Sequence, residues 1–263
     1  MPPLSIPIGG LELLLTARPL TREAFAAFGD VIENPRPGLR PSPAAAAGIA
    51  PGSLPFDGVV ANQGSAIKYQ HVSRPRDLYS QAPSRVPAAG IMSMFVCGAR
   101  TLKRLPGTEE AQTAQGGRAA DCFVVEILER HPFTTQTFIP LAADPAARFL
   151  VIVAPSLPPS TADEALPVPG AGDGSKLPGR GLPDLRRLCA FTATAGQAVT
   201  YGAGTWHAPM VALGSAGTAI DFVVVQAANG VAIEDCQEVV FKSPGNTRPR
   251  LVVQVPQPRA SKL

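Results

Sequence analysis

Two of the three histidines in the chain lie in segments whose residue types could carry out chemistry. His131 stands in residues 129–132, which read Glu-Arg-His-Pro, and His207 ends the glycine-rich residues 204–207. A neutral imidazole can bind a metal ion or take up a proton near physiological pH. Either histidine alone would be more typical of a satisfied polar residue beside a turn. The pair, in matched surroundings, predicts one reaction centre built from two distant strands.

The residues around each histidine predict the elements that hold them. Residues 133–140 alternate large apolar with small polar side chains, which is typical of a strand with one buried face. Residues 199–207 form an extended run that ends in a glycine-rich turn. We therefore expect both histidines at the ends of strands.

Many further short apolar segments lie between turn residues. With 29 prolines and 25 glycines the chain favours a loop-rich all-β fold over a helical bundle. A short helix is expected within residues 16–28, with Thr21 as N-cap, Gly29 as its stop, and Phe25 and Phe28 facing inward. The predicted strands are 58–61, 66–71, 91–97, 122–130, 135–141, 149–154, 189–194, 197–201 and 220–226. Strands of this number and length indicate a sandwich or barrel.

One domain is expected, because no break along the chain separates two complete hydrophobic cores. Residues 16–245 form this domain, after an N-terminal segment 1–15 and before an extended tail 246–263. Long loops are predicted at about 35–58, 106–117 and 156–183, where Pro, Gly and Ala dominate. Residues 184–187 could add a single helical turn.

Composition and charge exclude several classes of protein. The net charge is +3, but the basic residues are dispersed, so nucleic-acid binding is not supported. No apolar run is long enough to span a bilayer, and the N-terminus lacks the features of a signal peptide. The four cysteines lie far apart and are interpreted as reduced, with packing rather than catalytic roles.

The last three residues, Ser261, Lys262 and Leu263, match the peroxisomal address. They follow a polar, proline-rich stretch that would leave them accessible. We therefore expect a peroxisomal protein whose C-terminus binds the import receptor.

The chain resembles the ureidoglycolate lyase family of allantoin and purine catabolism, in its longer, fungal form. The resemblance covers about residues 16–240 and rests on several motifs in order. These motifs are 19–21 with Phe25, 28–32, 62–64 with 68–69, 129–140, 206–207 with Pro209, 221–222 and 235–236. It implies a cupin-like double-stranded β-helix, or jelly-roll barrel, and a homodimer.

The same resemblance implies a site at the four positions where cupins hold a divalent metal. These positions read Glu129, His131, Gln136 and His207, so a glutamate replaces one histidine and a glutamine replaces the carboxylate. A carboxylate and two imidazoles can hold nickel, manganese or zinc, whereas Gln136 would be a poor ligand. The set leaves two roles open for the histidines, as metal ligands or as acid and base.

The implied reaction cleaves (S)-ureidoglycolate to glyoxylate and urea. His131 and His207 would move protons, and Lys68 would hold the substrate carboxylate. Tyr69, Tyr201 and Gln136 are candidate substrate contacts, and Asp221 is a candidate to orient an imidazole. Lys68 as a solvated strand lysine, and Asp221 in a turn or dimer contact, are the alternatives. Trp206 is expected in the cavity wall and His71 on the surface.

Two other functions stay open at this point. One is a cupin-like protein that binds a small organic acid without turnover, and the other is a hydrolase that releases ammonia from the urea group. Detection of glyoxylate separates the first from a lyase, and intact urea among the products excludes the second.

Overall fold

A computed structural model describes residues 3–8, 11–105, 120–170, 180–242 and 251–256. Most of the regular secondary structure in these ranges is β-strand, and the predicted all-β, cupin-like class is confirmed. None of the helices in these ranges is long and apolar enough to cross a membrane. The predicted loop at 106–117 lies outside the described residues, as does part of the loop at 156–183.

The largest sheet forms the middle layer of the barrel. In spatial order its strands are β1 (Leu4–Pro7), β18 (Gln237–Lys242), β10 (Ile127–Arg130), β15 (Trp206–His207), β12 (Arg148–Ala154), β13 (Cys189–Thr194) and β3 (Arg18–Pro19), with β16 (Val211–Leu213) beside β12. Strand β12 is buried almost throughout. This explains its unbroken apolar sequence, since other layers cover both of its faces.

A five-stranded sheet covers one face of the middle layer. Its order is β4 (Gly29–Ile32), β14 (Ala198–Tyr201), β11 (Gln136–Pro140), β17 (Ala219–Ala228) and β7 (Ala89–Gly98). Aromatic rings fill the space between the two sheets, with Phe149 and Phe222 in edge contact at 5.1 Å between ring centres. Phe25 and Phe28 join this core, as the sequence predicted.

A third sheet covers the other face and includes residues from both ends of the chain. Its order is β2 (Leu13–Thr16), β19 (Leu251–Gln254), β9 (Ala120–Val124) and β8 (Lys103–Leu105). The sequence predicted that 1–15 and 246–263 would lie outside the domain. Instead β2 and β19 pair with each other, and the buried strand β19 also pairs with β9.

The short helices lie between strands. They are α1 (Arg22–Phe25), α2 (Pro43–Ala47) and α4 (Ala232–Asp235), with single 3-10 turns η1 (Asn62–Gly64), η2 (Tyr79–Gln81), η3 (Thr161–Asp163) and η4 (Leu185–Arg187). Thr21 caps α1 as predicted, because its hydroxyl accepts from the Ala24 N–H at 3.2 Å. The turn expected at 184–187 is η4.

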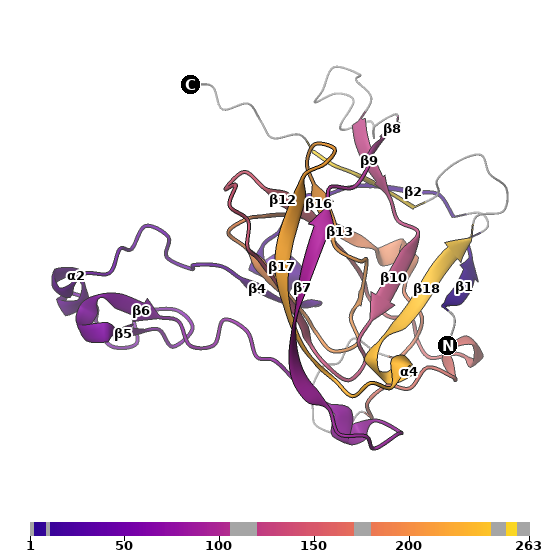
Figure 1. Cartoon of the computed structure of the whole chain (residues 1–263), viewed down its shortest axis with the longest axis horizontal. Helices are drawn as coiled ribbons and strands as arrows, with labels where there is room; N and C mark the ends of the chain where they lie inside the picture. The colour runs from indigo at the N-terminus through magenta and orange to yellow at the C-terminus, as the bar shows by residue number, and fades with distance from the viewer. Residues whose placement is uncertain (1–2, 9–10, 106–119, 171–179, 243–250, 257–263) are drawn as a thin grey trace.

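Residues 42–70 form an arm that projects from the barrel (Figure 1), and its Phe56 ring centre lies 4.9 Å from the guanidinium carbon of Arg22 on α1. The arm holds α2 and a two-stranded sheet of β5 (Val59–Ala61) and β6 (Ala66–Lys68). Residues 35–58 were predicted as a loop, which is wrong for α2. Ser42 caps this helix, and Pro43 occupies its first turn, where a missing N–H costs nothing.

Candidate active site

Strand pairing brings the two histidine segments together, as the sequence predicted. Glu129 on β10 stands directly opposite His207 on β15, and His207 Nε2 lies 3.6 Å from a carboxylate oxygen of Glu129. His131 follows β10, and its ring centre lies 5.5 Å from that of His207. The Gly204 N–H donates to the carbonyl oxygen of His131 at 2.8 Å, which fixes one segment to the other. Gly204 has φ +80°, a conformation that favours glycine in this turn.

Backbone carbonyls fix the tautomer of both imidazoles. His131 Nδ1 lies 2.6 Å from the carbonyl oxygen of Asp235, and His207 Nδ1 lies 2.9 Å from that of Thr205. A carbonyl oxygen can only accept, so each Nδ1 carries a hydrogen and donates it. In the neutral rings both Nε2 atoms then present a lone pair. His131 Nε2 is buried and has no hydrogen-bond partner in the described structure.

Two glutamines and a tyrosine complete the surroundings of His207. Gln136 Oε1 lies 3.2 Å from His207 Nε2, and Gln136 Nε2 donates to Gln226 Oε1 at 2.6 Å. If His207 is neutral, the Gln136 amide must turn so that its N–H donates to the ring. Tyr201 stacks on His207 with 4.0 Å between ring centres and 10° between planes. This contact holds the imidazole in one orientation.

Burial and nearby charge set the protonation of these groups. Burial, and next the charge on His207, lower the pKa of His131 to about 4. Burial alone would raise the pKa of Glu129, but its interactions with His207 and His131 hold that pKa below the usual range. Burial, followed by the charge of Glu129, raises the pKa of Tyr201 well above its ordinary value. At neutral pH the site therefore holds a neutral His131 and an ionised Glu129.

The donor set fits a divalent metal ion. One ligand atom from each of Glu129, His131 and His207 lies within 4.8 Å of the others. The unpartnered Nε2 of His131 is the lone pair that a metal would use, and its Nδ1–H is held by a carbonyl as metal-bound histidines require. Two imidazoles and a carboxylate are a common ligand set for first-row metals.

The buried His131 predicts a loss of stability at acid pH in the metal-free protein. The folded pKa of about 4 lies below the ordinary value of 6.5, so the unfolded chain binds the proton first as the pH falls. The stabilisation is therefore present above about pH 6.5 and is lost towards pH 4, at a cost of about 3 kcal/mol. Thermal unfolding between these pH values, with a chelator present, measures it.

The matched control for this pH dependence is the exposed His71. We expect His71→Ala to keep the same slope of stability against pH, and His131→Gln to lose most of it. An unchanged slope in His131→Gln would assign the acid transition to other groups.

Lys68 and Tyr69 do not reach the histidines of their own chain. Lys68 is exposed on β6, and the Tyr69 ring packs near Gly58 in the arm. The prediction that Lys68 lies at this site is therefore wrong within a single chain. His71 is exposed 3.8 Å from Asp57, in agreement with the prediction of a surface residue.

Asp221 faces away from the site. It is exposed on β17, whereas Phe222 and Val224 on the same strand are buried in the core between the sheets. Side chains of a strand alternate between faces, so the polar residue that shares the inner face is Gln226. The prediction that Asp221 orients an imidazole is wrong, and the alternation along 220–226 could have selected Gln226.

Trp206 also faces away from the histidines. Its strand neighbour His207 points to the site, so Trp206 points to the core on the other side of the sheet, where its indole N–H donates to the Gly181 carbonyl at 3.0 Å. The prediction that Trp206 lies in the cavity wall is wrong, because neighbouring residues of a strand point to opposite faces of the sheet. The four cysteines all lie in the described ranges and are not joined in disulfide bonds.

Fold and site together define a class of protein, a cupin-like barrel with two histidines and a glutamate converging between its sheets. A family model described as ureidoglycolate lyase matches residues 12–248. The chain belongs to the ureidoglycolate lyase family.

Curated relatives agree with this family. A ureidoglycolate lyase of Schizosaccharomyces pombe is 33% identical over 230 residues, which is 87% of this chain and 92% of the relative. One of Saccharomyces cerevisiae is 37% identical over 155 residues, covering 59% and 62% of the two chains. One of Burkholderia mallei is 28% identical over 211 residues, covering 80% and 81%.

Proposed function

We propose that the protein is a carbon–nitrogen lyase that cleaves ureidoglycolate to glyoxylate and urea. The observation that carries the proposal is the convergence of Glu129, His131 and His207 in a chain matched over residues 12–248 by the ureidoglycolate lyase family. In the reaction the α-hydroxyl loses its proton as its C–O bond becomes C=O. The C–N bond breaks, and its electron pair goes to the urea nitrogen, which takes up a proton.

The side chains of the site match these two proton movements. His131 offers an unpartnered Nε2 lone pair and accepts the hydrogen bond of the α-hydroxyl. His207, beside the ionised Glu129, is the group that carries a proton to the departing urea nitrogen. The amides of Gln136 and Gln226 provide N–H donors for the carboxylate or urea oxygen. These assignments go beyond the sequence, which left acid and base open.

In the alternative arrangement a divalent metal would be held by Glu129, His131 and His207 and would supply positive charge beside the substrate oxygens. Because each Nδ1 donates to a backbone carbonyl, the metal would occupy both Nε2 atoms, and the histidines would then act as ligands in place of acid and base. Metal analysis of the purified protein, before and after chelation, tests this part. Loss of the metal from His131→Ala, with retention in His71→Ala, would place it at these ligands.

The products test the proposed reaction. Pure protein incubated with ureidoglycolate should release glyoxylate above the spontaneous background, together with one equivalent of urea. No glyoxylate above background would leave a protein that only binds the acid. Ammonia in place of urea would show a hydrolase.

We also propose that the protein is a homodimer that uses the outer face of β7 and its neighbours. Met92, Met94 and Val96 on this face are 78%, 57% and 69% exposed. Val223 on β17 pairs with Met94, and the exposed Ile139 on β11 pairs with Val223, so these two residues extend the face across the sheet. The exposed Asp221 lies on the same face, opposite Val96. An exposed, largely apolar face on an edge strand is typical of a surface that another chain covers.

A charge in this face is expected to separate the dimer. Met94→Glu places a carboxylate where the second copy would exclude water, so sedimentation should show a monomer where the unmodified protein is a dimer. Leu157→Glu, at a half-exposed leucine outside the face, is the matched control. A monomeric parent protein, or a dimeric Met94→Glu, would contradict the proposal.

Import into peroxisomes through Ser261, Lys262 and Leu263 is a further proposal, and these residues lie outside the described ranges. It is supported by the match of the three residues to the peroxisomal address. A fluorescent fusion that keeps this C-terminus should enter peroxisomes, and the same fusion with Leu263→Ala should stay outside them.

A further inference from the structure

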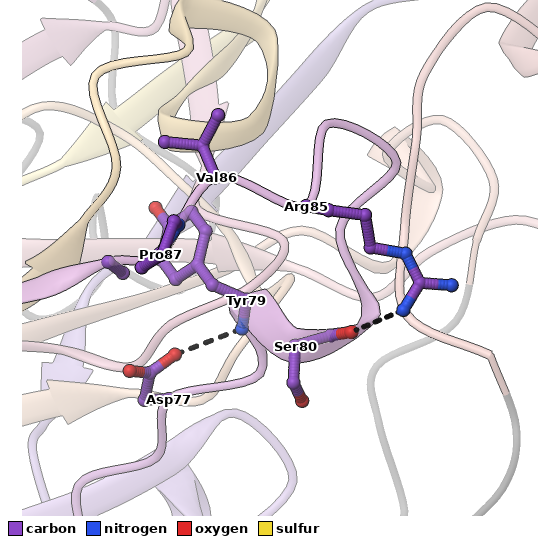
Figure 2. A pocket seen from close by; sticks show the side chains of 7 residues that line it. Asp77, Tyr79, Ser80, Arg85, Val86 and Pro87 are labelled. Atoms are coloured by element: carbon purple, nitrogen blue, oxygen red, sulfur yellow. Dashed lines mark hydrogen bonds between the residues drawn. The ribbon is translucent and has the colours of Figure 1, made fainter.

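A hollow of 460 Å³ lies beside the barrel, and neither active-site histidine lines it. Figure 2 shows Asp77 and Arg85 on opposite sides of the turn that carries Tyr79 and Ser80. Val86, Pro87 and Ala88 complete the lining. The hollow therefore combines a guanidinium, a carboxylate and an aromatic ring, and its volume suits a small molecule.

Arg85 is held in a conformation that side chains rarely adopt. Its φ is 57°, in the left-handed region that is costly for residues other than glycine. The residues on both sides fix it. The Ser84 N–H and hydroxyl donate to the buried carboxylate of Glu234 at 2.8 and 2.6 Å, and the Asn229 side chain donates to the Val86 carbonyl at 3.3 Å. Strain that its surroundings maintain in this way is typical of functional sites.

The lining selects the class of ligand. One N–H of the Arg85 guanidinium donates to the Ser80 carbonyl at 3.3 Å, and the exposed remainder presents further donors in a planar fork that suits a carboxylate. Asp77, on the opposite side, accepts from the Tyr79 N–H at 2.9 Å and has further lone pairs for an N–H donor. A small acid that carries both a carboxylate and an N–H group matches the hydrogen-bonding chemistry of these two side chains.

The hollow and the active site share α4 as an anchor. The Tyr79 hydroxyl donates to the Asp235 carboxylate at 2.6 Å, and the backbone carbonyl of Asp235 accepts from His131 Nδ1, also at 2.6 Å. Glu234, the neighbour of Asp235, holds the turn of Arg85. A ligand that moves Tyr79 or this turn therefore acts on the residue that orients His131.

We propose that this hollow is a second binding site for a small carboxylate with an N–H group, and that its occupancy alters the hydrogen bond between Asp235 and His131. The residues that line the hollow are the only support that the proposed binding needs. Only the consequence for catalysis rests on the proposed function.

Calorimetric titration of the full chain with oxamate, a small carboxylate with an amide N–H, tests the binding. Arg85→Asn removes the guanidinium but tolerates the left-handed backbone, so it should fold normally and bind oxamate about tenfold or more weakly. Arg186→Asn, at an exposed arginine elsewhere, is the matched control and should bind as the parent does. Any binding of oxamate at the histidine site would occur equally in the parent and in both variants, so it would not contribute to the difference in affinity between them.

The Nδ1 proton of His131 tests the coupling without any assay of turnover. Its NMR signal is assigned by its loss in His131→Gln, and oxamate should shift it in the parent protein. Tyr79→Phe should keep the affinity for oxamate and lose most of the shift. Equal affinity in Arg85→Asn and Arg186→Asn would overturn the site. A His131 signal that oxamate leaves unmoved in the parent would overturn the coupling, whether or not the protein is a lyase.

Discussion

Replacing either His131 or His207 by alanine is expected to lower turnover of ureidoglycolate by a factor of about 100 or more, the usual contribution of one acid–base group. The two imidazoles lie 5.5 Å apart, and each is fixed by a carbonyl that sets its tautomer. Neither histidine can take the place of the other, because only His207 is paired with Glu129 and stacked on Tyr201.

Folding must be measured beside turnover, since both side chains are buried. His131→Ala leaves the Asp235 carbonyl without its donor, a loss of about 1–3 kcal/mol that thermal unfolding would detect. His71→Ala is the matched control, because the third histidine of the chain is exposed and outside the site. Folded variants at both positions with activity close to that of His71→Ala would show that the pair is structural.

The sequence predicted those parts of the fold that rest on local patterns. The strand predicted within 133–140 is present as β11, although Gln136, Thr137 and Phe138 are all buried, so the strand does not have a single buried face. The apolar run at 149–154 is β12. The arm was missed because residues 35–58 carry no periodicity, and α2 depends on a single cap at Ser42. Strand β19 was missed because its partners β2 and β9 lie far away in the sequence.

The candidate site was predicted as far as its residues follow a motif. Glu129, His131, Gln136 and His207 converge because strand pairing brings their segments into register. The sequence predicted Asp221 as the partner of an imidazole because buried acids often need one, but alternation along the strand turns Asp221 outward and Gln226 inward. The role of Asp235 could not be predicted, since it orients His131 through a backbone carbonyl that every residue has.

The same alternation places Arg130 between the two site residues Glu129 and His131, on the opposite face of β10. Arg130 is fully buried, and its guanidinium lies 4.4 Å from the centre of the Trp206 ring. It donates to Gln237 Oε1 at 2.8 Å, to the Gly181 carbonyl at 3.1 Å and to the Arg180 carbonyl at 3.0 Å. Burial lowers the pKa of Arg130 to about 10, so it remains charged at neutral pH.

Replacing Arg130 by methionine is therefore expected to destabilise the protein by about 3 kcal/mol or more, because the two carbonyls and the Gln237 amide stay buried without their donor. Chemical unfolding measures the loss, with the exposed Arg186→Met as the matched control. Equal stability of the two variants would mean that water replaces the guanidinium. Arg130 is the last residue of the strand that carries Glu129, and His131 follows it, so turnover should fall with stability. Arg130→Lys keeps the charge but loses the planar fork and should recover only part of both stability and turnover.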